Sequence, residues 1–431
     1  MIVDDDGFLA LGKKEELGAK DHVLLKYYFE TYIDPKKAAI HLCREQSTAM
    51  WKRVDVDEDF RPVYGAKVVE LNVLGKTATP GFDTIFTKEK EFIQAEAIIA
   101  HPIINFGARI PNLLTSIAGE GAFYSPGINC IKLLDIEFPK KFLQKFTGPR
   151  FGIKGLRETL GIEDRPFVFG VVKPNIGLKP REFAKIAGEA YQGGLDVAKD
   201  DETLADMEYN PLAERVRLVA KEMEKAEKKT GEKKMFVANI TDEVENLVEL
   251  HDVVLKNGGN ALMLNALPVG LSACRMLCNR NKIPIVSHFD FIAPMSRIPK
   301  FGISTKVMTK LQRLAGFDAI IMPGFGERMH MTELEVIDNV QECLKPLGDI
   351  KPSLPVPGGS DWAGTLPFIY EKLKTVDFGT VPGRGVFGHP LGPKAGAKSI
   401  RQAWEAIEKG IALKDYAKNH IELKKAMDCF G

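Results

Sequence analysis

From about residue 150 onward, short apolar segments alternate with helical segments, and this alternation limits the folds open to the chain. The helical segments carry start and stop signals, such as Pro180 with Gly193 and Pro211 with Gly231. The expected strands are 166–172, 195–198, 235–240, 261–265, 283–287, 318–322, 354–357 and 376–381. Eight strand and helix units in about 250 residues are typical of an α/β protein with a (β/α)8 TIM barrel.

Residues 1–145 lack this regularity and mix strands with helices. Strands are expected at 22–29, 63–74, 92–99 and 128–136, with one helix starting at Asp34-Pro35 and another at 110–117. Such a mixture predicts a smaller α+β domain. We therefore expect an N-terminal α+β domain at 1–145, followed by the C-terminal barrel at 146–431.

The composition excludes several classes of partner. The chain has 431 residues and a formal net charge of +1, which predicts no attraction to nucleic acid or to a membrane surface. Its start lacks the pattern of a signal peptide, and no apolar run is long enough to span a bilayer, so we expect a cytoplasmic protein. Six cysteines are too few for a disulfide framework in a chain of this length.

The second expected barrel strand ends in a lysine followed by three acids, Lys199-Asp200-Asp201-Glu202. Active sites of such barrels lie at the C-terminal ends of the strands, and clustered acids are costly unless a cation binds them. Asp201 and Glu202 offer oxygen ligands suited to Mg²⁺, and Lys199 could supply a third ligand if CO₂ converted its amine to a carbamate. On this stretch alone, a solvated acidic turn with Lys199 as its counter-ion is an equally good interpretation.

Other strand ends add to this rim and favour an active site. Lys173 and Asn175 follow the first expected strand, and His288 follows the fifth. Glycine-rich segments follow the seventh and eighth strands, at Gly358-Gly359-Ser360 and Gly383-Arg384. Barrels commonly bind phosphate there through exposed backbone N–H groups. The sequence thus predicts a site for a divalent metal and at least one phosphate.

Over nearly its whole length the sequence resembles the large subunit of ribulose bisphosphate carboxylase/oxygenase (RuBisCO), with matching motifs at 45–51, 170–175, 193–202 and 388–392. The resemblance implies that Lys199 is carbamylated by CO₂ and binds Mg²⁺ with Asp201 and Glu202. It also implies that Lys173 transfers protons during enolisation and that His288 belongs to the active site. It further implies a homodimer with shared active sites, to which the partner subunit contributes Glu45, Trp51 and Glu120.

Several positions depart from the carboxylase pattern. The second lysine of its Lys-Pro-Lys motif is Asn175 here, the phosphate-binding arginine after the strand 5 histidine is Phe289, and the strand 6 histidine is Ile321. The remaining departures are Arg328 for the loop lysine that orients CO₂, Gly358 for a serine, Arg384 for a phosphate-binding glycine and Glu120 for an asparagine. This pattern is similar to the RuBisCO-like proteins, the type IV branch, and most of all to its group from photosynthetic sulfur bacteria, a branch that does not fix CO₂.

The departures have physical consequences. Phe289 and Ile321 remove cationic and hydrogen-bonding groups from one end of the site, which predicts a substrate with one phosphate and a less polar tail. Arg328 spreads its charge over a planar fork and is a poor substitute for an ammonium group, so carboxylation should fail. Enolisation needs a Lewis acid, a base and an acid, and the groups for these roles remain.

We therefore expect a Mg²⁺-dependent enolase or isomerase that acts on a phosphorylated ketose or diketone, including methylthio compounds, in sulfur metabolism. The alternative is a non-catalytic regulatory or stress-response protein that retains metal and phosphate binding. A true carboxylase is the least favoured interpretation.

Overall fold

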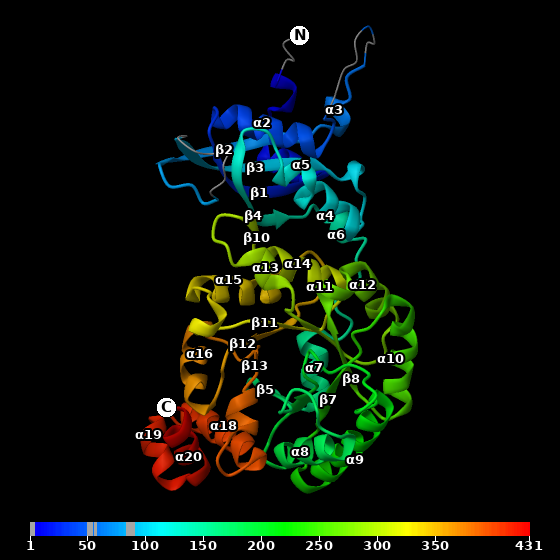
Figure 1. The fold of residues 1–431 in the computed structure, drawn as a ribbon, viewed down its shortest axis with the longest axis vertical. Helices are drawn as coiled ribbons and strands as arrows, with labels where there is room; N and C mark the ends of the chain where they lie inside the picture. Colours follow the sequence, from blue (N-terminus) through cyan, green and yellow to red (C-terminus); the bar gives the residue numbers. More distant parts are fainter. Residues whose placement is uncertain (1–4, 50–54, 56–57, 83–90) are drawn as a thin grey trace. The chain divides into compact units, whose positions relative to one another are not determined.

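The computed structural model describes residues 5–49, 55, 58–82 and 91–431, which divide into two compact units (Figure 1). The first unit comprises 1–147, 291–311 and 347–350. The second comprises 148–290, 312–346 and 351–431. The N-terminal unit therefore includes two segments from late in the chain, which the sequence analysis did not anticipate.

A five-stranded sheet forms the centre of the first unit, in the order β10-β4-β1-β3-β2. Its strands are β1 (His22–Thr31), β2 (Lys67–Thr77), β3 (Phe92–Pro102), β4 (Ile128–Glu137) and β10 (Gly302–Ile303). The first four pair antiparallel, whereas β10 pairs parallel with β4, so the sheet is mixed. The predicted α+β character of this unit is confirmed.

The helices of this unit follow local sequence signals. α2 starts at Pro35 because the Asp34 side chain accepts a hydrogen bond from the backbone N–H of Lys37 (3.0 Å). The strand expected from residue 63 was wrong at its start, since Pro62 lies in the first turn of a short helix and β2 begins at Lys67. The helices are η1 (Asp5–Phe8), α1 (Lys14–Ala19), α2 (Pro35–Gln46), α3 (Arg61–Tyr64), η2 (Ile103–Asn105), α4 (Ile110–Ala118), α5 (Glu120–Phe123), α6 (Lys140–Leu143), α13 (Ile292–Ser296) and α14 (Thr305–Ala315), which continues into the second unit.

Eight parallel strands form the second unit, in the order β12-β11-β9-β8-β7-β6-β5-β13. They are β5 (Phe167–Val171), β6 (Val197–Lys199), β7 (Met235–Asn239), β8 (Ala261–Asn265), β9 (Ile285–His288), β11 (Ala319–Pro323), β12 (Leu354–Gly358) and β13 (Gly379–Thr380). Because β13 contacts both β5 and β12, the sheet is a nearly closed barrel, as predicted. Apolar side chains such as Phe169, Val237 and Val356 fill its interior.

Helices alternate with the barrel strands. The predicted capping box at the start of α15 is present, where Thr332 and Glu335 exchange hydrogen bonds with each other's backbone N–H. The helices are α7 (Gly152–Leu160), α8 (Pro180–Gln192), α9 (Leu212–Thr230), η3 (Val244–Asn246), α10 (Leu247–Lys256), α11 (Ala266–Val269), α12 (Leu271–Arg280), η4 (Glu327–Met329), α15 (Glu333–Leu344), η5 (Ala363–Thr365), α16 (Leu366–Leu373), α17 (Gly383–Phe387), α18 (Pro393–Glu408), α19 (Leu413–Tyr416), η6 (Ala417–Asn419) and α20 (Ile421–Phe430).

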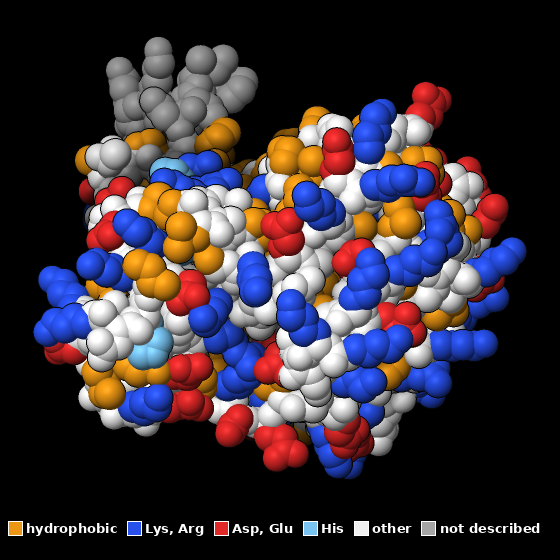
Figure 2. Space-filling view, turned by 90° about the horizontal axis from the view of Figure 1, so that it is seen from below, with side chains coloured by type: hydrophobic (Ala, Val, Ile, Leu, Met, Phe, Trp, Pro, Cys, Tyr) orange, Lys and Arg blue, Asp and Glu red, His pale blue; other side chains and the backbone are white. Residues whose placement is uncertain are grey.

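The surface carries charges of both signs. Figure 2 shows basic and acidic side chains interspersed over one face of the molecule. Among the described residues, no helix combines the length and the apolar character that crossing a bilayer requires.

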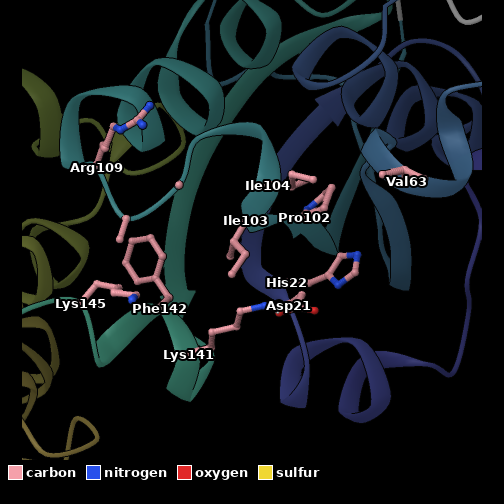
Figure 3. Close-up of a pocket in the computed structure, with 12 residues that line it drawn as sticks. Asp21, His22, Val63, Pro102, Ile103, Ile104, Arg109, Lys141, Phe142 and Lys145 are labelled. Atoms are coloured by element: carbon pink, nitrogen blue, oxygen red, sulfur yellow. Dashed lines mark hydrogen bonds and ion pairs between the residues drawn. The ribbon is translucent and has the colours of Figure 1, made fainter.

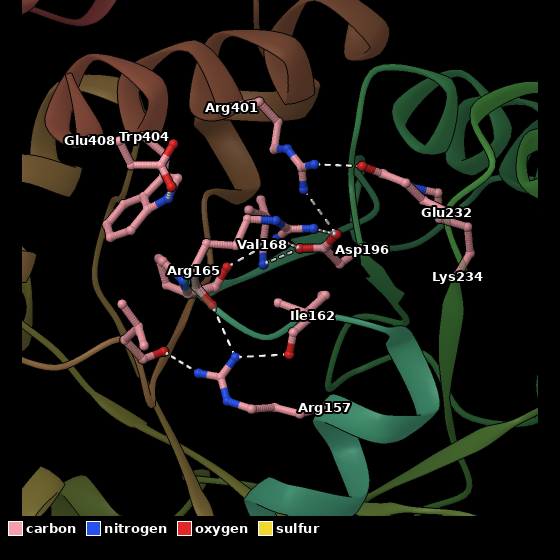
Figure 4. Close-up of polar contacts among 12 residues, drawn as sticks. Arg157, Ile162, Arg165, Val168, Asp196, Glu232, Lys234, Arg401, Trp404 and Glu408 are labelled. Carbon is pink, nitrogen blue, oxygen red and sulfur yellow. Dashed lines mark hydrogen bonds and ion pairs between the residues drawn. The ribbon is translucent and has the colours of Figure 1, made fainter.

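A buried carboxylate ties the N-terminal ends of the first two barrel strands together (Figure 4). Asp196, which precedes β6, is 1% exposed and accepts hydrogen bonds from both Nη atoms of Arg165 (2.6 and 2.7 Å) and from the Val168 backbone N–H (2.9 Å). Arg401 of α18 adds a longer contact of 3.3 Å. Burial alone would raise the pKa of Asp196, but Arg165 and Arg401 hold that pKa below its ordinary value of 3.8.

We expect Asp196→Ala to lower the free energy of unfolding by about 3 kcal/mol at neutral pH, because Arg165 would lose its buried counter-ion. Since the folded pKa of Asp196 is depressed, this contribution is complete above pH 3.8 and is lost as the pH falls through the folded pKa. Urea denaturation of both proteins at a series of pH values measures the difference, which should narrow in acid.

Asp377→Ala is the matched control, because Asp377 also pairs with a partly buried arginine, Arg157 (2.8 Å), but its own side chain is 44% exposed. We expect Asp377→Ala to lower the free energy of unfolding by about 1 kcal/mol or less, because water screens this pair. Equal losses in the two variants would contradict this account of Asp196.

Candidate active site

Lys199 ends β6 with its side chain completely buried. Its Nζ lies 3.5 Å from Oε2 of Glu202 and makes no hydrogen bond to any described residue. Burial lowers the pKa of Lys199, although the carboxylates of Glu202 and Asp201 oppose the shift. A lowered pKa increases the share of the neutral amine, whose free lone pair can act as a nucleophile.

Asp201 lies beside Lys199 and is held in one orientation. Its Oδ2 accepts a hydrogen bond from Nζ of Lys173, which follows β5 (2.8 Å), and its Oδ1 accepts from the Thr203 hydroxyl (2.7 Å). Burial alone would raise the pKa of Asp201, but these partners hold it below its ordinary value. Lys173 also donates to Oδ1 of Asn175 (2.8 Å), so the ammonium group is shared between two acceptors.

His288 ends β9 and lies on the other side of Glu202. Its Nε2 is 3.5 Å from Oε2 of Glu202, and its Nδ1 is 3.1 Å from Oδ2 of Asp290. The imidazole stacks on the ring of Phe289, with centroids 4.6 Å apart. The sequence analysis missed Asp290, although a carboxylate two residues after a histidine at a strand end is a recognisable signal for an orienting partner.

Two asparagines fix the backbone of the acidic run. Asn239 at the end of β7 and Asn265 at the end of β8 donate from Nδ2 to the carbonyl oxygen of Glu202 (3.0 and 2.9 Å). The other acid of the run, Asp200, is fully buried, pairs with Arg215 of α9 (2.9 Å) and accepts a hydrogen bond from the backbone N–H of Asn239 (2.9 Å). Asp201 and Glu202 are therefore the acids of the run that remain for a ligand.

These side chains fit a divalent metal if CO₂ modifies the lysine. Among the described residues, no three His, Cys, Asp or Glu side chains are grouped as a metal would need. Asp201 and Glu202 supply two carboxylates, and the buried Lys199 amine beside them has no hydrogen-bonding partner in the described structure. A carbamate on Lys199 would complete a set of three oxygen-donor side chains suited to Mg²⁺.

The glycine-rich segments lie at the same end of the barrel. A side chain on Gly359 would come within 2.5 Å of the Phe325 carbonyl oxygen, and a Cβ on Gly383 would lie 3.6 Å from Cε of Lys173. Gly358 ends β12, and the exposed Ser360 has a left-handed backbone (φ +62°). The Gly383 segment therefore adjoins Lys173, whose ammonium group contacts Asp201.

Asp361 joins the two glycine-rich segments and was also missed by the sequence analysis. Its buried carboxylate accepts hydrogen bonds from the Val381 backbone N–H (3.1 Å) and the Thr380 hydroxyl (3.3 Å). Burial raises the pKa of Asp361 to about 6.

The remaining predicted residues of the barrel lie in different surroundings. Phe289 packs against the barrel interior, to which Ile321 (2% exposed) belongs. Arg328 is exposed in η4, and the guanidinium group of the exposed Arg384 lies over the ring of Phe430 in α20, 5.3 Å from its centroid. Stacking on this ring leaves the N–H donors in the plane of the guanidinium group available to an anion.

The residues expected to act across a subunit interface belong to the first unit. Glu45 lies near the end of α2 and Glu120 begins α5, and the absence of a side chain on Gly121 allows its backbone to approach the carbonyl of Glu45. Glu45 and Glu120 thus stand on adjacent elements. Trp51 lies outside the described residues.

We expect the raised pKa of Asp361 to appear as a pH-dependent stability. Between its ordinary pKa of 3.8 and the folded value of about 6, the folded state binds the proton more tightly, so stability falls as the pH rises. Relative to Asp361→Asn, which keeps both acceptor contacts, the wild type should lose about 3 kcal/mol over this range. Urea denaturation of the pair at several pH values tests this, and a constant difference would contradict it.

Comparison with known proteins identifies the family. The chain matches the model of the ribulose bisphosphate carboxylase large chain catalytic domain over residues 152–430, and the N-terminal domain model over residues 13–142. It is 56% identical to the ribulose bisphosphate carboxylase-like protein of Chlorobaculum tepidum, covering 99% of this chain and 97% of that protein. The corresponding protein of Allochromatium vinosum is 55% identical, over 99% of this chain and 93% of the relative.

More distant relatives differ in their named activities. A 3-oxo-isoapionate-4-phosphate decarboxylase of Rhizobium rhizogenes is 31% identical, covering 95% of this chain and 98% of that enzyme. Among solved structures, a rubisco-like protein from Burkholderia fungorum superposes with a TM-score of 0.88 at 29% identity, over 95% of this chain and all of the other. A dimeric archaeal Rubisco from Hyperthermus butylicus gives a TM-score of 0.83 at 31% identity, over 96% of each chain. The chain therefore belongs to the ribulose bisphosphate carboxylase large-chain family, as one of its RuBisCO-like proteins.

Proposed function

We propose that this RuBisCO-like protein catalyses the Mg²⁺-dependent enolisation or isomerisation of a phosphorylated ketose or diketone and does not fix CO₂. The observation that carries the proposal is the buried Lys199 amine, 3.5 Å from Glu202 and next to the pair formed by Lys173 and Asp201. A surface counter-ion would be solvated, whereas this amine is sequestered with the groups that proton transfer requires.

Each of these side chains has a role in the proposed reaction. Lys199 as a carbamate, Asp201 and Glu202 would hold Mg²⁺, which would polarise a substrate carbonyl. Lys173 donates a proton, since its ammonium group already makes two short hydrogen bonds to oxygen. His288 provides a second group for proton transfer: its Nε2 lies 3.5 Å from Oε2 of Glu202, and its Nδ1 lies 3.1 Å from Oδ2 of Asp290 without hydrogen-bonding geometry.

The proposed substrate carries one phosphate group. The Gly359 N–H hydrogen-bonds the Asp361 carboxylate, and the Gly383 N–H donates to the carbonyl of Val381 (2.8 Å). The backbone N–H of Ser360 and the in-plane N–H groups of Arg384 are therefore the donors proposed for one anion. Phe289 and Ile321 make the other end apolar. The named substrate of the Rhizobium relative is likewise a monophosphate with an oxo group, and decarboxylating a 3-oxo acid leaves an enolate. That chemistry supports an enolate-forming site here.

Carboxylation is not part of the proposal. Arg328 stands where the carboxylase family has the lysine that orients CO₂, and its guanidinium group is exposed on a short helix. Phe289 stands where that family has a phosphate-binding arginine, and its ring offers no hydrogen bond to a second phosphate.

We also propose a homodimer in which Glu45, Trp51 and Glu120 complete the active site of the partner subunit. The adjacency of Glu45 and Glu120 in the first unit supports a shared role, and the Hyperthermus butylicus relative is described as dimeric. A place in sulfur metabolism is supported by the similar proteins of Chlorobaculum and Allochromatium, which are photosynthetic sulfur bacteria.

The second candidate is a non-catalytic regulatory or stress-response protein of sulfur metabolism. The two hydrogen bonds from Lys173 to Asp201 and Asn175 (2.8 Å each) favour it, since they engage the proposed proton donor with acceptors of the protein itself. Such a protein would bind Mg²⁺ and phosphate but move no proton.

We expect the protein, treated with bicarbonate and Mg²⁺, to exchange a carbon-bound proton of a ketose monophosphate with D₂O. Proton NMR of ribulose 5-phosphate, ribulose 1-phosphate and a methylthio-substituted ketose phosphate measures the exchange. Lys199→Met should slow it by about 100-fold or more, because neither the carbamate nor the complete ligand set could form. Lys185→Met, on the exposed face of α8, should leave it unchanged.

The non-catalytic alternative has a distinct signature in the same samples. Mg²⁺ binding that depends on bicarbonate and Lys199, without exchange in any ketose phosphate, would reject the enolase proposal and favour that alternative. Incorporation of labelled CO₂ into an acid-stable product would instead show that the protein fixes CO₂, contrary to the proposal.

We expect ribulose 5-phosphate to bind about tenfold more tightly than ribulose 1,5-bisphosphate, because the apolar end cannot solvate a second phosphate. Phe289→Arg should narrow this difference, and Phe289→Leu should preserve it. Calorimetric titration in the presence of Mg²⁺ and bicarbonate measures both affinities. Equal affinities in the wild type would show that the second phosphate has other ligands.

A further inference from the structure

The first unit contains a cavity that has no part in the proposed reaction. It has a volume of about 700 Å³ and lies where β3 ends and the chain continues through η2 towards Arg109 (Figure 3). Small-molecule sites usually enclose roughly 300 to 1,000 Å³, so the cavity is large enough for an organic ligand.

One part of the lining is apolar. Ile103, Ile104, Val63 and Phe142 all face this space, and Figure 3 shows Phe142 and Ile103 on opposite sides of it. Ile104 is 61% exposed and Val63 is 55% exposed, although both are large aliphatic residues. Adjacent exposed aliphatic side chains in a concave site mark a surface that gains free energy when an apolar group covers it.

The charged part of the lining is predominantly basic. Arg109, Lys141 and Lys145 line the cavity, against a single acid, Asp21. Lys141 pairs with Asp21 (2.8 Å), but both side chains are more than half exposed, so water already screens this pair. Burial lowers the pKa of His22 below its ordinary value of 6.5. Its imidazole is therefore neutral near pH 7 and adds no charge to the lining of the cavity.

The cavity walls are fixed by contacts within the unit. The backbone N–H of Ile103 donates to the carbonyl of Asp21 (2.8 Å), and the N–H of Gly107 donates to the carbonyl of Ile103 (2.7 Å). Phe142 is almost completely buried in a row of aromatic rings, Phe106, Phe138 and Phe146, with centroids 5.1 to 6.3 Å away. A ligand would therefore enter a preformed site at little conformational cost.

We propose that this cavity binds an amphipathic organic monoanion, a carboxylate with an aliphatic tail. The tail would lie against Ile103, Ile104 and Phe142, and the carboxylate would face Lys145 and Arg109 at the rim. Lysine ammonium groups act as point charges and suit a single carboxylate, whereas phosphate sites are typically built from convergent backbone N–H groups.

The proposal is independent of the enolase assignment, because no residue of the barrel rim takes part in it. If the cavity does not bind the carboxylate, the enolase proposal is unaffected, and if the protein is not an enolase, the cavity proposal is unaffected.

Calorimetric titration of the full chain with decanoate tests the proposal. The decyltrimethylammonium cation, which has the same aliphatic tail and the opposite charge, is titrated as the control. Both are used below the concentrations at which they form micelles. We expect decanoate to bind with a Kd below about 1 mM and the cation to bind at least tenfold more weakly. No binding of decanoate, or equal binding of both amphiphiles, would overturn the proposal.

Matched variants locate the site. Lys145→Glu should weaken decanoate binding about tenfold, whereas Lys140→Glu should change it less than about twofold. Lys140 is an exposed lysine at the start of α6 and does not line the cavity. Ile104→Glu, at an exposed position where folding is not at risk, should also weaken binding about tenfold or more by placing a carboxylate in the apolar wall. Equal effects of the two lysine changes would show that decanoate binds elsewhere and would reject the cavity.

Discussion

The active-site rim depends on the buried ion pair between Asp200 and Arg215. Both side chains are fully buried, and Arg215 contacts both carboxylate oxygens while the backbone N–H of Asn239 donates to one of them. Asp200 is thereby held towards α9, so that Lys199 and Asp201, its neighbours on either side, share the opposite face. Removing Arg215 would leave an uncompensated buried charge at the centre of the run, and the ligand set would lose its geometry.

The site residues that match the carboxylase and those that differ from it have different proposed roles. The side chains proposed to transfer protons or bind a cation lie within 3.5 Å of at least one other member of their set: Lys173, Lys199, Asp201, Glu202 and His288. Phe289 and Arg328, which differ from the carboxylase pattern, are proposed to affect the second phosphate and CO₂. Polarising a carbonyl and transferring a proton need fewer precisely placed groups than carboxylation with CO₂. The residues for CO₂ and the second phosphate can therefore change while the residues for enolisation are retained.

The barrel and its rim could be predicted because strand periodicity and strand-end position are local properties of a sequence. Lys199, Asp201 and His288 were found in this way. Asp290 and Asp361 were not, because their contacts depend on how loops fold back on the strand ends. The pairing of β10 with β4 joins segments 170 residues apart through two residues each, too few to leave a periodic signal. The stacking of Arg384 on Phe430 is likewise a tertiary contact that strand order does not predict.

The two proposed anion sites, at the barrel rim and in the cavity of the first unit, would recognise anions by different means. At the rim, the Ser360 N–H, Arg384 and the neighbouring Lys173 would suit a dianionic phosphate, whose oxygens accept several hydrogen bonds at once. At the cavity, Lys145 and Arg109 would supply charge at an exposed edge, and the binding energy would come mainly from covering Ile103, Ile104 and Val63, because Phe142 is already buried. A sugar phosphate gains little from those aliphatic walls, and an aliphatic carboxylate leaves the donors of the rim unpaired. Each proposed site would therefore bind the ligand of the other weakly. The aliphatic side chains of the cavity would stay exposed in one case, and hydrogen-bond donors of the rim would stay unpaired in the other.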